Sequence, residues 1–216
     1  DCRAIVLAAQ GKNFCAGANF GAGSEDTGGA EASEGGKISG HLYQYAVRIF
    51  EAKTPVVAAI QGAAIGGGLG LAVSTDFRVT CPEGRFSANF TRLGFHPGFG
   101  LTYTLPRLIG HNKATEMFYT GRRVKGEEAL AMGLADKLVP LDEVRSASID
   151  FAREMALSAP LAVQATRATM RAGLADEVRK ATDHELVEQN RLRLTNDWNE
   201  GVQAMAERRA PAFTGT

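Results

Sequence analysis

Two glycine-rich stretches have the residue types and spacing needed to hold a negatively charged oxygen atom. The first, KNFCAGANF (12–20), follows the apolar run AIVLAA, and the second, QGAAIGGGLGLAVSTD (61–76), follows VVAAI. Glycine lets a backbone approach a ligand closely, and a helix start presents N–H groups that have no intrahelical partner. These stretches predict a site for an anion or a developing oxyanion, although glycines at such turns also serve packing.

A third stretch, SANFTRLGFHPG (87–98), carries a histidine that could transfer protons. His96 lies between Phe95 and Pro97, and the ordinary histidine pKa of about 6.5 suits an acid or a base at neutral pH. The alternative is a structural histidine bonded to the backbone. Alternation along an extended segment predicts two sides, one with Phe90, Arg92 and Gly94, the other with Asn89, Thr91 and Leu93.

Short apolar runs between glycine-rich turns and helical stretches must position these residues. AIVLAA, VVAAIQG, FRVTC and DKLVP predict buried strands, so residues 1–140 indicate a layered α/β domain. From Leu141 the pattern is helical. We expect Asp142 to cap one helix, Pro160 to begin the next, and a single helix to cover residues 175–198. Such polar helices pack on the main domain or on another subunit.

The segment 21–40 contains glycine, serine and acidic residues with little to bury, so it predicts either a mobile lid or a disordered stretch. A helix over 38–52 follows, because apolar residues recur at helical spacing up to Pro55. His41 and Tyr43 belong to this helix, where the ordinary interpretation is a surface or half-buried polar group.

The composition excludes several classes of partner. The 24 Lys and Arg balance 24 Asp and Glu, so no electrostatic argument favours nucleic acid or an anionic membrane. No apolar run is long enough for a membrane span. The cysteines, odd in number and without metal-ligand spacing, predict reduced thiols in a cytoplasm and no bound metal. Because the chain begins in a strand pattern without Met, we expect the natural protein to begin earlier.

Several ordered motifs together resemble the crotonase (enoyl-CoA hydratase/isomerase) superfamily. The motifs are FCAGANF, PVVAAIQGAAIGGGLGLA, DFRV, FSANFTRLGFHPGFG, YTGRRVKGEEALAMGLADKLVP and NEGVQAMAERRAPAFTG. The resemblance implies a spiral of ββα units over residues 1–140, without the family's first strand and helix. It also implies a C-terminal helical region, residues 141–216, that forms trimers, often paired into hexamers.

The resemblance also implies a ligand, an acyl-CoA thioester, with no cofactor beyond its coenzyme A moiety. By motif position the oxyanion is held by the backbone N–H groups of Ala16 and Gly67. Losing one such donor costs roughly 3 to 4 kcal/mol of transition-state stabilisation. The segment 21–40 becomes a loop of the acyl pocket, and four residues are assigned to CoA: Phe14 and Ala18 at the adenine, Gly66 beside Gly67, and Arg208 at the phosphates.

The sequence departs from the superfamily's hydratases at both acidic positions, which are Gly70 and Phe90 here. Neither can move a proton, so a two-glutamate hydration is not expected. His96 is the nearest replacement and His41 a weaker one; a further position that is acidic in some relatives is Gly98. We interpret Glu116 and Asp76 as structural, and Asp183 and His184 as solvated.

Three functions remain open. The first is an acyl-CoA enzyme with a non-standard acid or base: an isomerase, a thioester or C–C hydrolase, or a hydratase for a special acyl group. The second is a non-catalytic acyl-CoA-binding protein, and the third is a structural subunit that keeps only the fold. Because Phe90 adds a ring and Gly70 lacks a side chain, we expect an apolar, roomier acyl site that prefers a bulky or aromatic group.

Overall fold

The computed structural model describes residues 2–18 and 41–216, whose strands form two sheets. The larger sheet is entirely parallel, and its strands, in spatial order, are β1 (Ile5–Ala8), β2 (Val56–Ile60), β4 (Phe77–Thr80) and β7 (Lys137–Leu138). In the smaller sheet β5 (Arg85–Ser87) lies between a parallel and an antiparallel neighbour, β3 (Ala63–Ile65) and β6 (Val124–Lys125). All four predicted strand runs contribute to the larger sheet, which confirms the α/β class.

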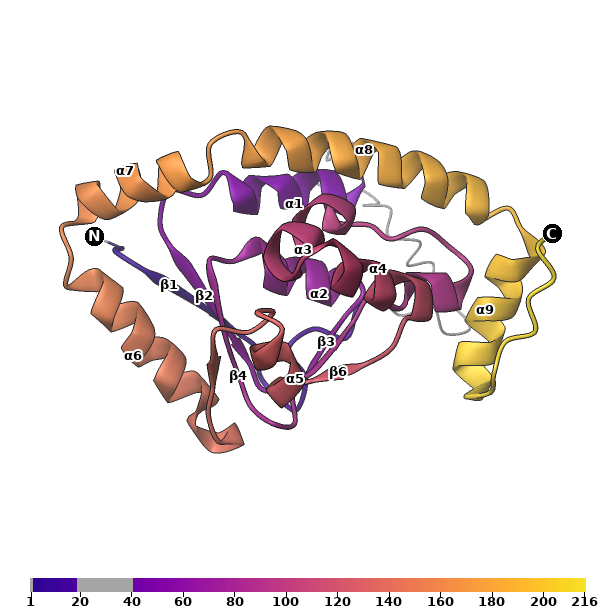
Figure 1. Cartoon of the computed structure of the whole chain (residues 1–216), viewed down its shortest axis with the longest axis horizontal. Helices are drawn as coiled ribbons and strands as arrows, with labels where there is room; N and C mark the ends of the chain where they lie inside the picture. The colour runs from indigo at the N-terminus through magenta and orange to yellow at the C-terminus, as the bar shows by residue number, and fades with distance from the viewer. Residues whose placement is uncertain (1, 19–40) are drawn as a thin grey trace, which may run out of the picture.

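Both faces of the larger sheet are covered, as the continuous apolar sequence of β2 requires. Val57 faces α6 (Val144–Ala156) and packs in one cluster with Ala152, whereas the neighbouring Ala58 faces the main core and packs with Leu69 of α2 (Gly67–Ser74). Successive residues of a strand point to opposite faces, so one strand serves both layers. Figure 1 shows α6 along one side of the strands and α2 on the other.

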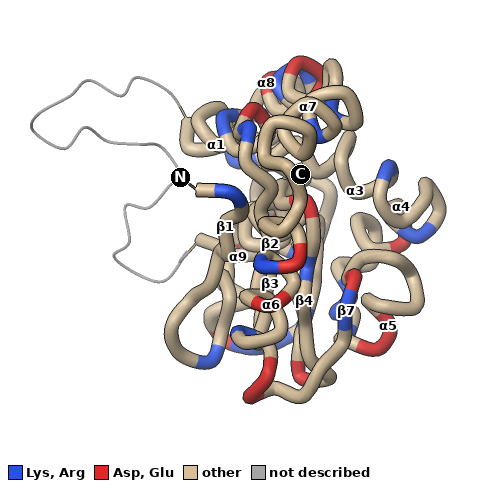
Figure 2. The backbone as a smooth tube through the Cα atoms, turned by 90° about the vertical axis from the view of Figure 1, so that its left-hand side faces the viewer, with Lys and Arg blue, Asp and Glu red and all other residues tan. Residues whose placement is uncertain are grey.

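The remaining helices surround the sheets, and α8 runs along one long side of the molecule (Figure 1). It packs on α1 and α3, and basic and acidic residues are interspersed along it (Figure 2). These helices are α1 (Leu42–Phe50), α3 (Leu101–Ile109), α4 (His111–Thr120), α5 (Gly126–Ala131), α7 (Pro160–Met170), α8 (Leu174–Leu192) and α9 (Asn196–Glu207), with 3₁₀ helices η1 (Asn89–Leu93) and η2 (Leu141–Glu143).

The C-terminal helices differ from the prediction in two places. The single helix expected over 175–198 is wrong, because α8 ends at Leu192 and Thr195 starts α9, its hydroxyl accepting the Trp198 N–H at 3.2 Å. Asp142 does not cap a helix; it lies inside η2, and α6 has no side-chain cap. Pro160 begins α7 as expected.

Two predicted segments near the glycine-rich turns also have different local structure. The helix predicted from residue 38 begins at Leu42, because His41 has an extended backbone and serves as the N-cap. The segment containing Phe90 is the 3₁₀ helix η1, ended by Gly94 in the left-handed region at φ 78°, so the predicted two-sided alternation is wrong. The lid expected over 21–40 lies outside the described residues.

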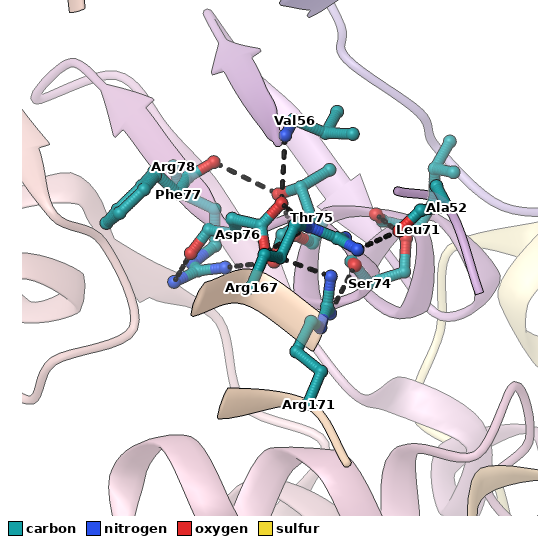
Figure 3. A network of polar contacts seen from close by, with 11 residues as sticks. Ala52, Val56, Leu71, Ser74, Thr75, Asp76, Phe77, Arg78, Arg167 and Arg171 are labelled. Carbon is teal, nitrogen blue, oxygen red and sulfur yellow. Dashed lines mark hydrogen bonds and ion pairs between the residues drawn. The ribbon is translucent and has the colours of Figure 1, made fainter. Parts of the chain in front are cut away.

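A buried ionic network joins the C-terminal helices to the sheet (Figure 3). Asp76 accepts the Val56 N–H at 2.8 Å, Arg167 Nε at 2.9 Å and Arg171 Nη1 at 3.0 Å. The Arg167 and Asp76 side chains are 8% and 14% exposed, so little water competes for these contacts. Asp76 therefore has the structural role predicted for it.

None of the helices within the described ranges is long and apolar enough to cross a bilayer.

Candidate active site

The two glycine-rich stretches lie against each other at the carboxyl ends of β1 and β2. Cys15 pairs in parallel with Ala64: its N–H donates to Ala63 at 2.8 Å, and its carbonyl accepts from Ile65 at 3.0 Å. A Cβ at Gly68 would overlap the Cys15 carbonyl oxygen, so this approach requires glycine. The sequence prediction that both turns share one site is consistent with this packing.

A glutamine that the sequence analysis did not single out fixes the first turn. The Gln61 side chain, directly after β2, places Nε2 3.0 Å from the carbonyl oxygens of both Gly11 and Asn13 and 3.2 Å from that of Ala9. Those three carbonyls belong to the loop that leads into CAGA. Gln61 therefore holds the loop against the end of β2.

A small pocket of about 50 Å³ opens where the turns meet. Its walls bring together Ala16, Gly67, Ala18 and Gly66, all predicted site residues, whereas Phe14 is buried and absent from the lining. The other lining residues are Gly17, Tyr43, Ile65, Asn89, Phe90, Leu93, Phe95 and Met205. Within the described residues, the Ala16 and Gly67 N–H groups donate no hydrogen bond. Both donors are therefore available to a ligand in this pocket.

A larger cleft of about 820 Å³ adjoins the pocket and shares part of its wall, including Asn89 and Met205. Its lining contains five arginines: Arg92, Arg122, Arg123, Arg208 and Arg209. A cleft of this size accommodates a cofactor-sized ligand. The cleft therefore extends the pocket into a basic channel.

Two of these arginines are neutralised by carboxylates. Arg122 pairs with Glu116 at 2.8 Å and Glu128 at 2.6 Å, which gives Glu116 the structural role predicted for it. Arg209 contacts Glu200 at 2.5 Å and also pairs with Glu207.

The other three arginines of the cleft, Arg92, Arg123 and Arg208, form no ion pair with the residues that the structure describes. Arg208 is exposed and ends α9 in the left-handed region at φ 57°. The cleft therefore contains free positive charge that suits an anionic ligand.

The two positions that the resemblance assigns to acids are occupied by apolar packing. A Cβ at Gly70 would overlap the Phe99 ring, so Phe99 fills the space beside α2. The prediction that Gly70 makes the acyl site roomier is wrong for this reason. Phe90 lines the pocket and is 2% exposed, and its ring lies 5.5 Å from that of Phe95, which lies 4.6 Å from that of Trp198.

Neither predicted histidine lines the pocket. His96 has Nδ1 2.8 Å from the Pro97 carbonyl oxygen, and its own carbonyl accepts from Gln189 Nε2 at 2.8 Å, so it corresponds to the structural alternative. His41 caps α1, accepting the Tyr43 N–H at Nδ1. Burial, followed by the charge of Arg193, lowers the pKa of His41, which keeps the cap nitrogen unprotonated. Asp183 and His184 are exposed, as predicted.

Tyr43 lines the pocket instead, and sequence reasoning placed it only on a helix with His41. Tyr43 is distant along the chain from both glycine turns, so nothing in the sequence indicated that it would line their pocket. No group of three His, Cys, Asp or Glu side chains that could hold a metal ion occurs among the residues that the structure describes. The polar groups that the described lining presents are the backbone N–H groups of Ala16 and Gly67, the Tyr43 phenol and the Asn89 amide.

Comparison with known proteins shows which family the chain resembles. The family model for enoyl-CoA hydratase/isomerase matches residues 1–216. The chain is 36% identical to the mitochondrial methylglutaconyl-CoA hydratase 1 of Pyricularia oryzae, over 99% of this chain and 65% of that protein, just under two thirds of its length. It is 33% identical to the enoyl-CoA isomerase/hydratase fer4 of Mycosarcoma maydis, over 99% of this chain and 77% of that protein.

A solved structure agrees with the sequence relatives. The crystal structure of an enoyl-CoA hydratase/isomerase from Pseudoalteromonas atlantica superposes with a TM-score of 0.86 and 29% identity, over 98% of this chain and 82% of the other. The crotonase fold expected from the motifs is thus confirmed. The chain belongs to the enoyl-CoA hydratase/isomerase family.

Proposed function

We propose that this chain binds an acyl-CoA thioester and stabilises the negative charge that develops on the thioester oxygen. The supporting observation is the pair of N–H groups, Ala16 and Gly67, which border one pocket and donate to no described residue. Preorganised backbone donors of this kind stabilise an enolate because they need no reorganisation as charge develops. The relatives named above are enoyl-CoA enzymes, which agrees with this ligand class.

The coenzyme A moiety is assigned to the basic cleft and to the turn beside the pocket. Arg208, one of the three cleft arginines without a carboxylate partner, is proposed to contact the phosphates. Backbone carbonyls of Phe14 and Ala18 are proposed to contact the adenine, with Gly66 beside the thioester. No cofactor beyond this moiety is proposed.

The reaction is proposed to differ from a two-glutamate hydration. The described lining of the pocket contains no carboxylate and no imidazole, because Gly70 and Phe90 occupy the acidic positions. An isomerase, a hydrolase or a hydratase for a special acyl group fits an enolate intermediate. The second candidate is a non-catalytic acyl-CoA-binding protein, which the same two residues favour.

The test is to delete one donor without changing the fold. Gly67 is the first residue of α2, a position where proline is tolerated, so Gly67→Pro removes the N–H and Gly67→Ala is the matched control that keeps it. The probe is acetoacetyl-CoA, whose bound enolate is followed by ultraviolet absorbance. Wild type is expected to bind and ionise it. Gly67→Pro is expected to ionise it roughly 100-fold less than Gly67→Ala, which also adds a side chain at this position but keeps the N–H. Absence of binding to wild type would refute the proposal.

A cytoplasmic homotrimer or hexamer is proposed as the assembled state. Large apolar side chains of the C-terminal helices are exposed, including Leu157 at 88%, Leu161 at 78% and Met170 at 77%. Contact with another copy of the chain would remove these side chains from water. Light scattering that gives a monomer mass at micromolar concentration would contradict the assembly.

A further inference from the structure

The side chain of Tyr43 reaches the pocket from α1 with its hydroxyl end toward Gly67. A methyl group built on Gly67 would lie 3.4 Å from Tyr43 Oη and 3.5 Å from Cε1. Tyr43 also lines the pocket together with Ala16. The phenol therefore lies on the pocket wall beside the two backbone donors.

Packing fixes this orientation of the ring. The Tyr43 ring lies 4.6 Å from the ring of His41, edge-on, and 5.4 Å from the ring of Phe99. A Cβ at Gly98 would overlap the edge of the Tyr43 ring, so the absence of a side chain at Gly98 leaves room for it. The same Phe99 ring fills the space beside Gly70. Aromatic packing thus excludes a side chain at position 70 and holds a hydroxyl group at the pocket.

The Tyr43 hydroxyl has a proton to donate and nothing in the described chain to receive it. No described residue forms a hydrogen bond with Oη. Burial raises the pKa of Tyr43 to about 12, although the nearby charge of Arg193 acts in the opposite direction and that of Glu185 adds to the rise. The phenol stays neutral at physiological pH, so it serves as a donor and not as a base.

The alternatives within the described lining are few. Asn89 is the other polar side chain there, and its Oδ1 would lie 3.5 Å from a methyl group on Gly66. The remaining lining side chains are apolar or absent. Tyr43 is therefore the O–H donor that the described pocket presents to a bound thioester.

We infer that Tyr43 donates a third hydrogen bond to the thioester oxygen as it becomes an enolate, beside the N–H groups of Ala16 and Gly67. The inference rests on the proposed acyl-CoA function and assigns a catalytic residue to it. No bond to Tyr43 is made or broken: the α-proton passes to water, the electron pair of the C–H bond moves to the thioester oxygen, and the phenol stabilises that charge. The hydroxyl comes from α1, not from the glutamate positions on α2 and η1.

Tyr43→Phe tests this role, with acetoacetyl-CoA as the probe and Tyr103→Phe as the control. Tyr103 belongs to the same hydrophobic cluster and does not line the pocket. Ionisation of the bound probe releases its α-proton to solvent, and the absorbance of its enolate is titrated against pH at saturating protein. Tyr43→Phe is expected to lower the ionisation constant of the bound probe about 100-fold, the effect of losing one oxyanion donor.

A structural role for Tyr43 predicts a different pattern. The dissociation constant of butyryl-CoA, which carries no enolate charge, is expected to change less than about threefold in Tyr43→Phe, since its neutral carbonyl makes a weaker hydrogen bond. An unchanged ionisation constant in Tyr43→Phe would overturn the inference while leaving the proposed function standing. An equal rise in the dissociation constants of acetoacetyl-CoA and butyryl-CoA would also overturn the inference, because the hydroxyl would then serve packing. Failure of wild type to bind acetoacetyl-CoA would instead refute the proposed function.

Discussion

The Phe99 ring occupies the volume that a side chain at position 70 would need. Phe99 adopts this place with a left-handed backbone, at φ 68°, which is a strained conformation for a residue with a bulky side chain. The packing of these two residues is therefore specific, and it leaves no room for a side chain at position 70.

A methyl group at position 70 is expected to destabilise the protein by overpacking against this ring. Gly70→Ala should lower the free energy of unfolding by roughly 1 to 3 kcal/mol. In a Phe99→Gly background the same substitution should cost much less, because the ring is gone. Urea unfolding of both single variants and the double variant measures the coupling. If the losses of unfolding free energy in the two single variants simply add in the double variant, the contact between positions 70 and 99 would be contradicted.

Removal of the Asp76 carboxylate is expected to be among the most damaging substitutions in the chain. Arg167 and Arg171 both pair with Asp76 in a buried setting, and Arg167 Nη1 also bonds the Ala52 carbonyl (Figure 3). Asp76→Ala leaves both cations uncompensated, so unfolding should become easier by about 3 to 5 kcal/mol. The control is Asp150→Ala, whose ion pair with Arg153 is exposed and should contribute less than about 1 kcal/mol. Equal losses of unfolding free energy in the two variants, measured by thermal unfolding, would refute the distinction between the buried and the exposed ion pair.

The stability of the fold is expected to fall with rising pH because of Glu185. This carboxylate accepts the Gly100 N–H at 2.6 Å and the Thr102 N–H at 2.9 Å at the start of α3. Burial raises the pKa of Glu185 to about 7, against the opposing effect of these donors. Since the folded pKa exceeds the unfolded one, the contribution is full below about pH 4.5 and is lost as pH rises through 7.

The pH dependence is measured as the difference between wild type and Glu185→Gln, which does not titrate. The unfolding free energy of wild type relative to the variant should drop by about 3 kcal/mol at most between pH 4.5 and 8. If urea unfolding gives parallel curves of unfolding free energy against pH for the two proteins, the Glu185 pKa is the same in the folded and unfolded states, and the prediction is wrong.

Arg208 is expected to contribute to coenzyme A binding through charge. Arg208→Ala should weaken CoA binding about tenfold at low ionic strength, as expected for a hydrogen bond to a charged group. The loss should shrink near about 1 M salt, where charges are screened beyond ~3 Å. Arg153→Ala removes an equal charge on α6, away from the cleft, and should have no effect. Calorimetry that finds equal effects would refute the assignment.

The sequence predicted the features that depend on local patterns. The apolar run VVAAI is a fully buried strand, and the two glycine turns border one pocket, because strand ends and helix starts follow from neighbouring residues. The choice of Ala16 and Gly67 within these turns came from the family resemblance. Contacts between segments that are distant along the chain could not be predicted from the sequence. The overlap of Phe99 with the space beside Gly70, and the arrival of Tyr43 from α1, depend on packing across the chain. The helix break near Thr195 was missed, although a threonine at an N-cap is a local signal.

The free N–H groups at Ala16 and Gly67 have a consequence for how the family can diversify. A backbone donor is retained by nearly every codon change at its position, since only proline removes it. The side chains around the pocket, by contrast, can be exchanged by one mutation on α1, α2 or η1. Selection can therefore exchange the side chains around the pocket while the two backbone donors are retained.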